Sequence, residues 1–362
     1  MEKNVSETAL EKIGKAIHSK RVAVIMHNNP DPDSIAAAFG MSLLFRKYFK
    51  VECEMFYGGI IGRAENRAMV SLLRIPLKKI EGLDLRVYRT VVLVDTQPSA
   101  GNNELPGKVN PNIVIDHHRP LRKKTRSAEY YDVRDRYGAT STIVLEYLRA
   151  SGIKIPRNVA TALFYGIKTD TYDLGRSIIR QDIDSYDFLK ERLNRTALAS
   201  IEKPLHTAQY FVQIHNALRN VEISGDALMT VLRDMEYPDI TAEVADWLYT
   251  LKTVRWVLVL GVDRNGVIFI SVRTRDRKRD AGRLIREVVG KHGMAGGHGQ
   301  IGGGSVALGT DDEKVIMSEL ARIRTRFFQM ITGRDVITTT GLIPAAGTAA
   351  ANQQESNSPG NA

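Results

Sequence analysis

Residues 21–49 have the sequence RVAVIMHNNPDPDSIAAAFGMSLLFRKYF, in which two apolar runs flank a polar loop. The first run, Arg21 to His27, is short and apolar, which predicts a buried strand. The second, Ser34 to Phe49, is long enough for a helix and contains no proline. A strand followed at once by a helix is typical of βαβ units and predicts a mainly parallel sheet.

The same alternation continues along the chain. Further strands are predicted in the first half at 51–57, 90–95 and 112–116, with helices at 65–74, 139–150 and 158–170. After a mainly helical stretch, a second block has predicted strands at 227–234, 256–263 and 266–274 and helices at 240–252 and 280–290. The pair Asn265-Gly266 favours a hairpin between the last two strands.

These patterns divide the 362 residues into four segments. We expect an α/β domain at 1–194, a helical linker at 195–222 and a smaller mixed α/β domain at 223–335. Residues 336–362 are rich in Thr, Ala, Asn, Ser, Pro and Gly and nearly uncharged, which predicts a disordered tail.

The composition limits the class of protein. The single cysteine, Cys53, excludes an internal disulfide and a Cys-based zinc site, and we expect it to be a buried small hydrophobe. No apolar stretch approaches the roughly 18–20 residues of a membrane span, and the N-terminal residues lack the apolar run of a signal peptide. These features favour a cytoplasmic protein without membrane contact. The net charge of +10 suits either an ordinary soluble surface or an anionic substrate.

Acidic and histidine side chains follow the predicted strands and end one predicted helix. Ligands of a parallel sheet bind outside the carboxyl ends of its strands, so these side chains are candidates for a site. For the first group, helix capping by Asp33 or Ser34 explains the pattern equally well. The residues are His27, Asp31, Asp33, Asp95, Asp116, His117, His118 and Asp170.

Two histidines and four aspartates of this set, His27, Asp31, Asp33, Asp95, His117 and Asp170, provide the nitrogen and oxygen ligands of a dinuclear site. Such a set suits Mn²⁺ better than Ca²⁺, which prefers oxygen ligands alone. Two neighbouring divalent ions can activate water and hold a phosphoryl group.

The order H-x-N-P-D-x-D, V-D-T, D-H-H and T-D-T resembles the four motifs of the DHH phosphoesterase superfamily, as does the segment YGATS at 137–141. Downstream, SVR at 271–273, GGH at 296–298 and GGG at 302–304 resemble the signature of the DHH-associated C-terminal domain. The resemblance implies two domains with the active site in the cleft between them.

The resemblance also implies a role for each matched residue. His27 and Asp31 would hold one ion, Asp33, His117 and Asp170 the other, and Asp95 would bridge the two. His118 would face the scissile phosphate as a catalytic residue, oriented by Asp116. The predicted substrate-binding residues are Ser271, Arg273, Gly296, Gly297 and His298.

Within the superfamily, the nanoRNase and phosphoadenosine-phosphate phosphatase type implies the function. Water activated by two divalent ions, with Mn²⁺ preferred, would hydrolyse very short oligoribonucleotides and also 3′-phosphoadenosine-5′-phosphate. The alternatives are a linear or cyclic dinucleotide phosphodiesterase and a single-strand exonuclease. A catalytically silent nucleotide-binding protein is the alternative from a different class. The expected partner is short RNA or a nucleotide, and a homodimer is expected from the resemblance alone.

Overall fold

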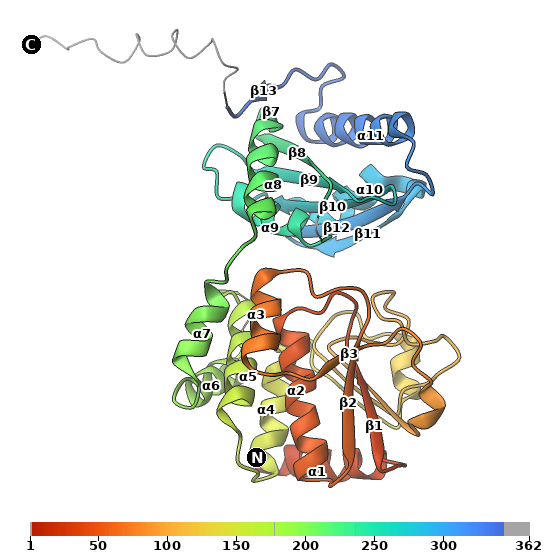
Figure 1. Cartoon of the computed structure of the whole chain (residues 1–362), viewed down its shortest axis with the longest axis vertical. Helices are drawn as coiled ribbons and strands as arrows, with labels where there is room; N and C mark the ends of the chain where they lie inside the picture. The colour runs from red at the N-terminus through yellow and green to blue at the C-terminus, as the bar shows by residue number, and fades with distance from the viewer. Residues whose placement is uncertain (1, 177, 236, 344–362) are drawn as a thin grey trace, which may run out of the picture. The chain divides into compact units, whose positions relative to one another are not determined.

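The computed structural model describes residues 2–176, 178–235 and 237–343 (Figure 1). The chain forms two compact units, which divide between Leu205 and His206. Unit 1 is the part up to Leu205 and unit 2 the part from His206.

The described part of unit 1 is built on a six-stranded sheet in the order β3-β2-β1-β4-β5-β6, and every strand pair is parallel. The order reverses at the centre, because β1 lies between β2 and β4. Loops that leave neighbouring strands in opposite directions open a crevice at such a point. The strands are β1 (Arg21–Ile25), β2 (Glu52–Tyr57), β3 (Leu77–Lys79), β4 (Thr90–Val94), β5 (Ile113–Asp116) and β6 (Tyr130–Val133).

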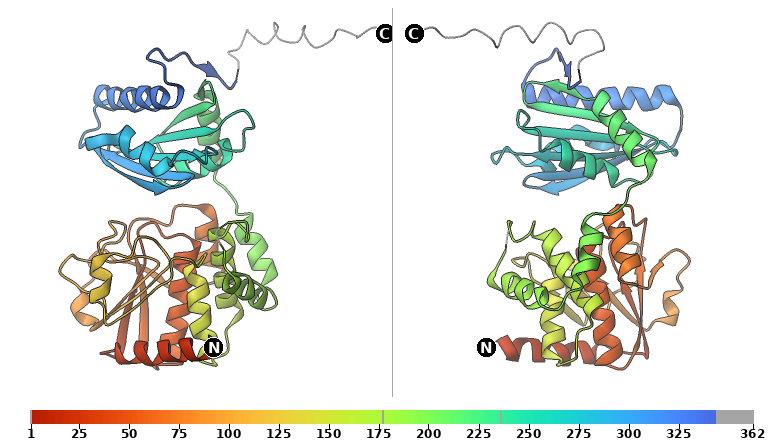
Figure 2. Two further views of the ribbon diagram at one scale, coloured as in Figure 1. Left: turned by 180° about the vertical axis from the view of Figure 1, so that it is seen from behind. Right: turned by 60° about the vertical axis from the view of Figure 1, so that its left-hand side comes forward.

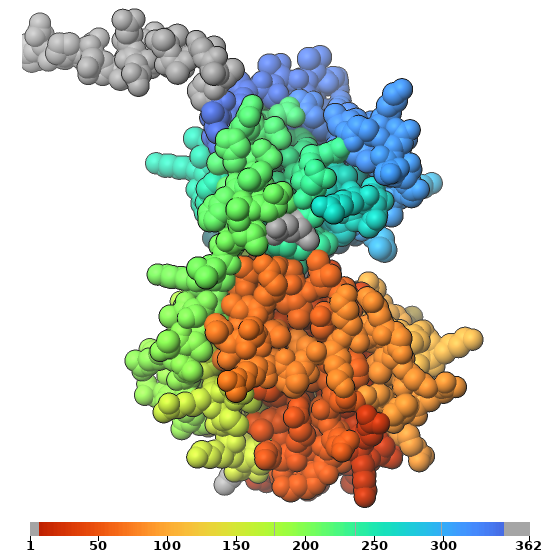
Figure 3. Space-filling view, viewed as in Figure 1, coloured from red at the N-terminus to blue at the C-terminus, as the bar shows by residue number. Residues whose placement is uncertain are grey.

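Helices cover one face of this sheet, and α2, α4 and α5 lie side by side on it (Figures 1 and 2). Alternate residues of β1 separate two cores: Val22 and Val24 face the helices, whereas Ala23 and Ile25 face a smaller cluster under the loops. α3 is at the surface, orange in Figure 3. The helices are α1 (Glu2–Lys15), α2 (Pro32–Lys47), α3 (Ala64–Leu72), α4 (Thr140–Ala150), α5 (Arg157–Asp170), α6 (Arg180–Lys190) and α7 (Arg195–Glu202), with 3₁₀ turns η1 (Leu85–Val87) and η2 (Lys123–Ser127).

Unit 2 has a mixed sheet in the order β11-β12-β10-β9-β8-β7-β13, in which only the described pair β8–β9 is parallel. Helices α10 and α11 share a core with one face, and α8 and α9 pack against β8, β9 and β10. The elements are β7 (Glu222–Ser224), β8 (Ala227–Arg233), β9 (Trp256–Val262), β10 (Val267–Thr274), β11 (Met294–His298), β12 (Ile301–Ala307), β13 (Thr340–Gly341), α8 (Ala208–Arg219), α9 (Ile240–Leu248), α10 (Ala281–Val289), η3 (Gly290–His292) and α11 (Glu313–Thr332).

The predicted fold class is confirmed: a parallel α/β domain precedes a second domain with a mixed sheet. The hairpin about Asn265-Gly266 joins β9 to β10, with Gly266 at a φ of 71°. Cys53 is buried in β2, as expected for a small hydrophobe. Among the described residues, no helix has both the length and the apolar character that crossing a membrane requires.

Two predicted segments differ from the structure. Residues 195–222 are not a separate linker, because α7 packs against α3 and α5 in unit 1 whereas α8 packs against β8 in unit 2. The predicted disordered tail is wrong for its first part, since Thr340–Gly341 form β13, which pairs with β7. The hydroxyl of Thr339 also donates to Glu222 at 2.9 Å. Residues 344–362 lie outside the described residues.

Replacing Gly282 of α10 with alanine is expected to destabilise unit 2 by about 1–3 kcal/mol. An ideal Cβ at Gly282 would lie 2.0 Å from the carbonyl oxygen of Gly297 in β11, a backbone atom that cannot rotate away. Alanine's helix propensity offsets only about 1 kcal/mol of this cost. Both tryptophans of the chain, Trp247 and Trp256, lie in unit 2, so their fluorescence during urea unfolding measures its stability.

The matched control is Gly296→Ala in β11, the strand that Gly282 contacts. A Cβ there has no heavy atom within 4 Å, and the φ of Gly296 is not in the left-handed region. Equal urea midpoints for Gly282→Ala and Gly296→Ala would contradict the close helix–strand packing.

Candidate metal centre

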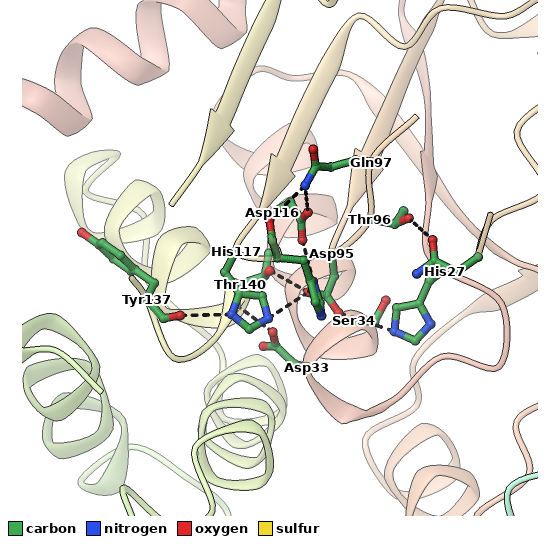
Figure 4. A network of polar contacts seen from close by, with 12 residues as sticks. His27, Asp33, Ser34, Asp95, Thr96, Gln97, Asp116, His117, Tyr137 and Thr140 are labelled. Atoms are coloured by element: carbon green, nitrogen blue, oxygen red, sulfur yellow. Dashed lines mark hydrogen bonds and ion pairs between the residues drawn. The ribbon is translucent and has the colours of Figure 1, made fainter. Parts of the chain in front are cut away.

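The predicted metal-binding residues gather at one edge of the unit 1 sheet, at the reversal of strand order (Figure 4). Asp95 follows β4 directly, and His117 follows β5. His27 and Asp31 lie in the loop between β1 and α2, and Asp170 ends α5. The carboxyl ends of three neighbouring strands and the end of one helix thus meet at a single place.

Capping explains part of the first motif, although not through the residues expected. Asp31 is the N-cap of α2, and its Oδ1 accepts a hydrogen bond from Ser34 N at 2.9 Å. Asp33 is buried and caps a different helix: its carboxylate accepts from Thr140 N at 2.7 Å and Ser141 N at 2.9 Å. These are the first residues of α4, where the helix dipole favours a carboxylate.

Potential ligand atoms lie on both sides of Asp95. His27 Nε2 lies 3.6 Å from Asp31 Oδ1 and 3.5 Å from Asp95 Oδ2. On the other side, His117 Nε2 lies 3.6 Å from Asp95 Oδ1 and 3.1 Å from Asp170 Oδ2. Three groups have ligand atoms that lie within 4.8 Å of one another: His27–Asp31–Asp95, Asp95–His117–His118 and Asp33–His117–Asp170.

Two atoms of this cluster are buried without a hydrogen bond in the described part of the chain: Asp95 Oδ2 and His117 Nε2. Leaving such atoms unsatisfied costs about 1–3 kcal/mol each. Asp95 also has a φ of 59°, a conformation that is uncommon outside glycine and is found at functional sites. A buried oxygen and a buried nitrogen without hydrogen bonds, each within 4 Å of another potential ligand atom, fit a divalent cation site.

Backbone carbonyl groups fix the orientation of the two histidines. Nδ1 of His27 lies 2.9 Å from the carbonyl oxygen of Asn28, and Nδ1 of His117 lies 3.1 Å from that of Tyr137. Because a carbonyl only accepts, Nδ1 carries the hydrogen in both rings and Nε2 is left for the cluster.

The buried Asp182 supports this arrangement, and the sequence analysis missed it. Its carboxylate accepts from Gly138 N at 2.9 Å and from the hydroxyl of Thr142 at 2.6 Å, which holds the turn that carries Tyr137. Asp182 belongs to α6 and lies outside every motif, so no local signal identifies it.

His118 and Asp116 form the predicted pair. Nδ1 of His118 lies 2.8 Å from Asp116 Oδ1, and half of the His118 side chain is exposed, at 50%. Burial disfavours a charged ring, but the carboxylates of Asp116 and Asp95 outweigh it and raise the pKa of His118 to about 9. In the metal-free protein the ring therefore holds a proton at neutral pH, and half of the side chain is open to solvent.

In unit 2 the predicted substrate-binding residues align across three strands. Ser271 pairs with Gly303, which pairs with Gly296. Arg273 is only 7% exposed, and its Nε donates to Asp246 Oδ1 of α9 at 2.5 Å. The hydroxyl groups of Ser271 and Thr241 lie 3.0 Å apart, so α9 fixes both candidates, and its contribution was not predicted.

The other two candidates have different outcomes. A Cβ at Gly297 would lie 2.3 Å from the carbonyl oxygen of Ile301 in β12, and the φ of Gly297 is 132°, which explains the absence of a side chain without a ligand. The side chain of His298 lies outside the described residues, so its role stays a prediction, as does the interdomain cleft.

Unit 1 resembles a known protein family. Residues 21–167 match the DHH family, N-terminal domain. These residues form a DHH domain. The match covers the first three motifs and ends three residues before Asp170.

The relatives of the chain are longer than the matched part. An uncharacterized protein of Methanocaldococcus jannaschii is 32% identical over 302 residues, which cover 82% of this chain and 61% of that protein. A probable manganese-dependent inorganic pyrophosphatase of Streptococcus pyogenes is 26% identical over 151 residues, or 42% of this chain and 48% of that protein. The chain thus spans less than two thirds of these relatives. Among solved structures, exonuclease RecJ bound to manganese matches with a TM-score of 0.46 and 14% identity, over 89% of this chain and 93% of that one.

The metal-free DHH domain holds extra protons in its cluster. Burial disfavours the imidazolium forms of His27 and His117, but nearby carboxylates, Asp31 and Asp170 foremost, outweigh it and raise both pKa values well above the ordinary 6.5. Burial and neighbouring carboxylates also raise the pKa of Asp33 well above its ordinary value.

Binding of Mn²⁺ is therefore expected to release protons and to tighten as the pH rises from about 6 to about 8. Each displaced proton contributes up to about tenfold in affinity per pH unit, because only the deprotonated ligands bind metal. The raised pKa values act in the opposite direction on the metal-free protein, whose stability they lower as pH rises, since its folded state binds more protons than the unfolded chain.

Calorimetric titration of Mn²⁺ in two buffers with different ionisation enthalpies measures the proton count directly. Mn²⁺ binding with no proton release and no pH dependence would contradict a site built from these residues.

Proposed function

We propose that the chain is a metal-dependent phosphoesterase that hydrolyses very short oligoribonucleotides. The observation that carries the proposal is the set of ligand groups on both sides of Asp95, at the carboxyl edge of the DHH domain sheet. His27 and Asp31 would hold one divalent ion, and Asp33, His117 and Asp170 the other. The name of the Streptococcus pyogenes relative supports manganese and phosphate chemistry at such a site.

The bound ions would supply the Lewis-acid charge that phosphoryl transfer requires. The chain itself contributes the proton donor. His118 Nδ1 is engaged by Asp116, so the proton at Nε2 is available to the oxygen that leaves the phosphorus. Asp116 is fully buried and keeps the ring in that orientation.

The candidate subsite in unit 2 offers one predicted cation, Arg273, whose Nε also donates to Asp246. Gly296 lies on the same row of the sheet as Ser271, and a Cβ at Gly296 would meet no heavy atom within 4 Å. A single cation near a glycine that leaves room for a ligand suits one terminal phosphate and therefore favours a short substrate. The same chemistry would accept 3′-phosphoadenosine-5′-phosphate.

The test is turnover with Mn²⁺ of a panel that contains RNA of two to about twenty-four nucleotides, cyclic dinucleotides, 3′-phosphoadenosine-5′-phosphate and pyrophosphate. We expect mononucleotides to be released fastest from the shortest RNA, and no release by an Asp95→Asn variant. Turnover of cyclic dinucleotides, pyrophosphate or long RNA alone would replace the substrate but keep the metal site. No turnover, with no Mn²⁺ bound, would favour the silent nucleotide-binding protein.

A further inference from the structure

Gln97 is a buried amide at the edge of the metal cluster, two residues after Asp95 (Figure 4). It is 3% exposed, and every hydrogen-bonding position of its amide is used. Nε2 donates to Asp116 Oδ2 at 2.8 Å and to the carbonyl oxygen of His118 at 3.0 Å. Oε1 accepts from Arg122 N at 2.8 Å and from the hydroxyl of Thr125 at 3.0 Å.

The donor half of this amide acts on the proton-donating pair. Because Gln97 occupies Asp116 Oδ2, the other oxygen, Oδ1, is directed to His118 Nδ1. The bond to the backbone of His118 fixes the same residue from its other end. A ring held at both ends keeps its Nε2 edge in one direction.

The acceptor half holds the segment 119–126, which we call the basic loop. Its exposed cations Arg122, Lys123 and Arg126 make no ion pair with any residue that the structure describes. Both contacts of Oε1 are to this loop, one to its backbone at Arg122 and one to the buried Thr125. Gln97 therefore links the unpaired cations of the basic loop to His118, the residue that would face the scissile phosphate.

We infer that Gln97 is a positioning residue that fixes His118 and the basic loop as one unit, so that the loop cations contact the phosphates beyond the scissile bond. The inference rests on the proposed function for its substrate. The ligand class is a phosphodiester chain of at least three nucleotides. A dinucleotide has one internucleotide phosphate, the scissile one, and leaves no further internucleotide phosphate for the basic loop.

Two substitutions separate the halves of the amide. Gln97→Glu keeps two acceptor oxygens for the basic loop but loses both donors and places a carboxylate beside Asp116. Gln97→Leu removes all four hydrogen bonds. Gln213→Leu is the matched control, because Gln213 is also buried but lies in unit 2.

Trypsin provides a readout that does not depend on activity. The loop offers Arg122, Lys123, Lys124 and Arg126 for cleavage, and cleavage reports local opening. We expect cleavage in 119–126 to be at least about tenfold faster in Gln97→Leu, and unchanged in Gln97→Glu and Gln213→Leu. Histidine ¹⁵N spectra, assigned with His118→Ala, should show an altered His118 ring in both Gln97 variants and not in the control.

The kinetic expectation splits kcat from KM. Gln97→Glu should lower kcat by about 10–100-fold, as for other supporting residues, with KM changed less than about threefold. Gln97→Leu should lower kcat similarly and raise KM at least about fivefold for a trinucleotide but not for a dinucleotide. Mn²⁺ affinity should stay within about twofold of the wild type in both.

Unchanged loop cleavage and an unchanged His118 spectrum in folded Gln97→Leu would overturn the inference. So would a fall in Mn²⁺ affinity that matches the fall in kcat, because Gln97 would then support the fold of the metal site alone. If Gln97→Leu does not fold, Gln97→Glu decides through kcat and the spectrum. If the wild type turns over no substrate, the proposed function fails, whereas the trypsin and spectral results still decide the positioning role.

Discussion

An Asp95→Asn variant is expected to lose at least about 1000-fold in kcat, the largest effect of any single substitution in this chain. Asp95 lies between the two predicted ion sites, with one oxygen 3.5 Å from His27 Nε2 and the other 3.6 Å from His117 Nε2. An amide offers one neutral oxygen where the carboxylate offers two charged ones. The substitution is therefore expected to weaken the binding of both ions at once.

The loss should not come from unfolding. Removing the charge of Asp95 relieves its repulsion of Asp33 but also removes its attraction for the protonated His27, His117 and His118. Because these effects oppose each other, we expect the metal-free variant to stay folded with a Tm close to that of the wild type, and to gain no stability from Mn²⁺. Metal content by mass spectrometry, Tm with and without Mn²⁺, and kcat on a dinucleotide measure the three effects.

Asp84→Asn is the control for a lost carboxylate, because Asp84 is exposed and lies away from the cluster, where it contacts Arg86. Wild-type kcat is expected for it. Retention of both Mn²⁺ ions and of kcat in Asp95→Asn would show that Asp95 does not bridge them.

Replacing His118 with alanine is expected to lower kcat by about 100–1000-fold while Mn²⁺ affinity and KM change little. His118 is the outermost member of the cluster, and the six expected metal ligands remain in place without it. The variant loses the proton donor for the leaving oxygen. The loss of kcat therefore depends on how strongly the departure of that oxygen requires protonation.

A substrate with a good leaving group tests this directly. The ratio of wild-type to His118→Ala kcat should fall by at least about tenfold when the nucleoside leaving group is replaced by p-nitrophenol, which departs without protonation. An equal loss on both substrates would assign His118 to binding and not to proton donation. Asp116→Asn should show the same dependence on leaving group with a smaller loss, because the ring remains but is oriented less well.

Local pattern was sufficient for the parallel domain and for the residues of its edge. Short Val- and Ile-rich runs such as those around Val24 and Val92 predict buried strands wherever they are placed. A polar residue directly after such a run must lie at the carboxyl edge of the sheet, and edges of parallel strands coincide. His27, Asp95 and His117 could therefore be expected together before any contact was known.

Glycine obscured the strands of unit 2. Strands β11 and β12 contain runs of glycine, which has low strand propensity, so no strand was predicted there. In the structure β11 pairs with β12 and β12 with β10, and Gly282 and Gly302 let α10 approach these strands at backbone distance. Strand β13 was not predicted either, because it has two residues, one of them glycine, and is defined only by its pairing with β7.

The sequence alone determined which residues end the strands of the DHH domain, because burial and chain direction are encoded locally. Only the tertiary structure decided what supports them: Asp182 under the Tyr137 turn, Thr140 at Asp95, and Gln97 between Asp116 and the basic loop. These partners lie 19 to 45 residues apart in the chain. A polar side chain satisfies its hydrogen bonds with whatever packing brings near, and that choice is made by the folded core and not by the neighbouring sequence.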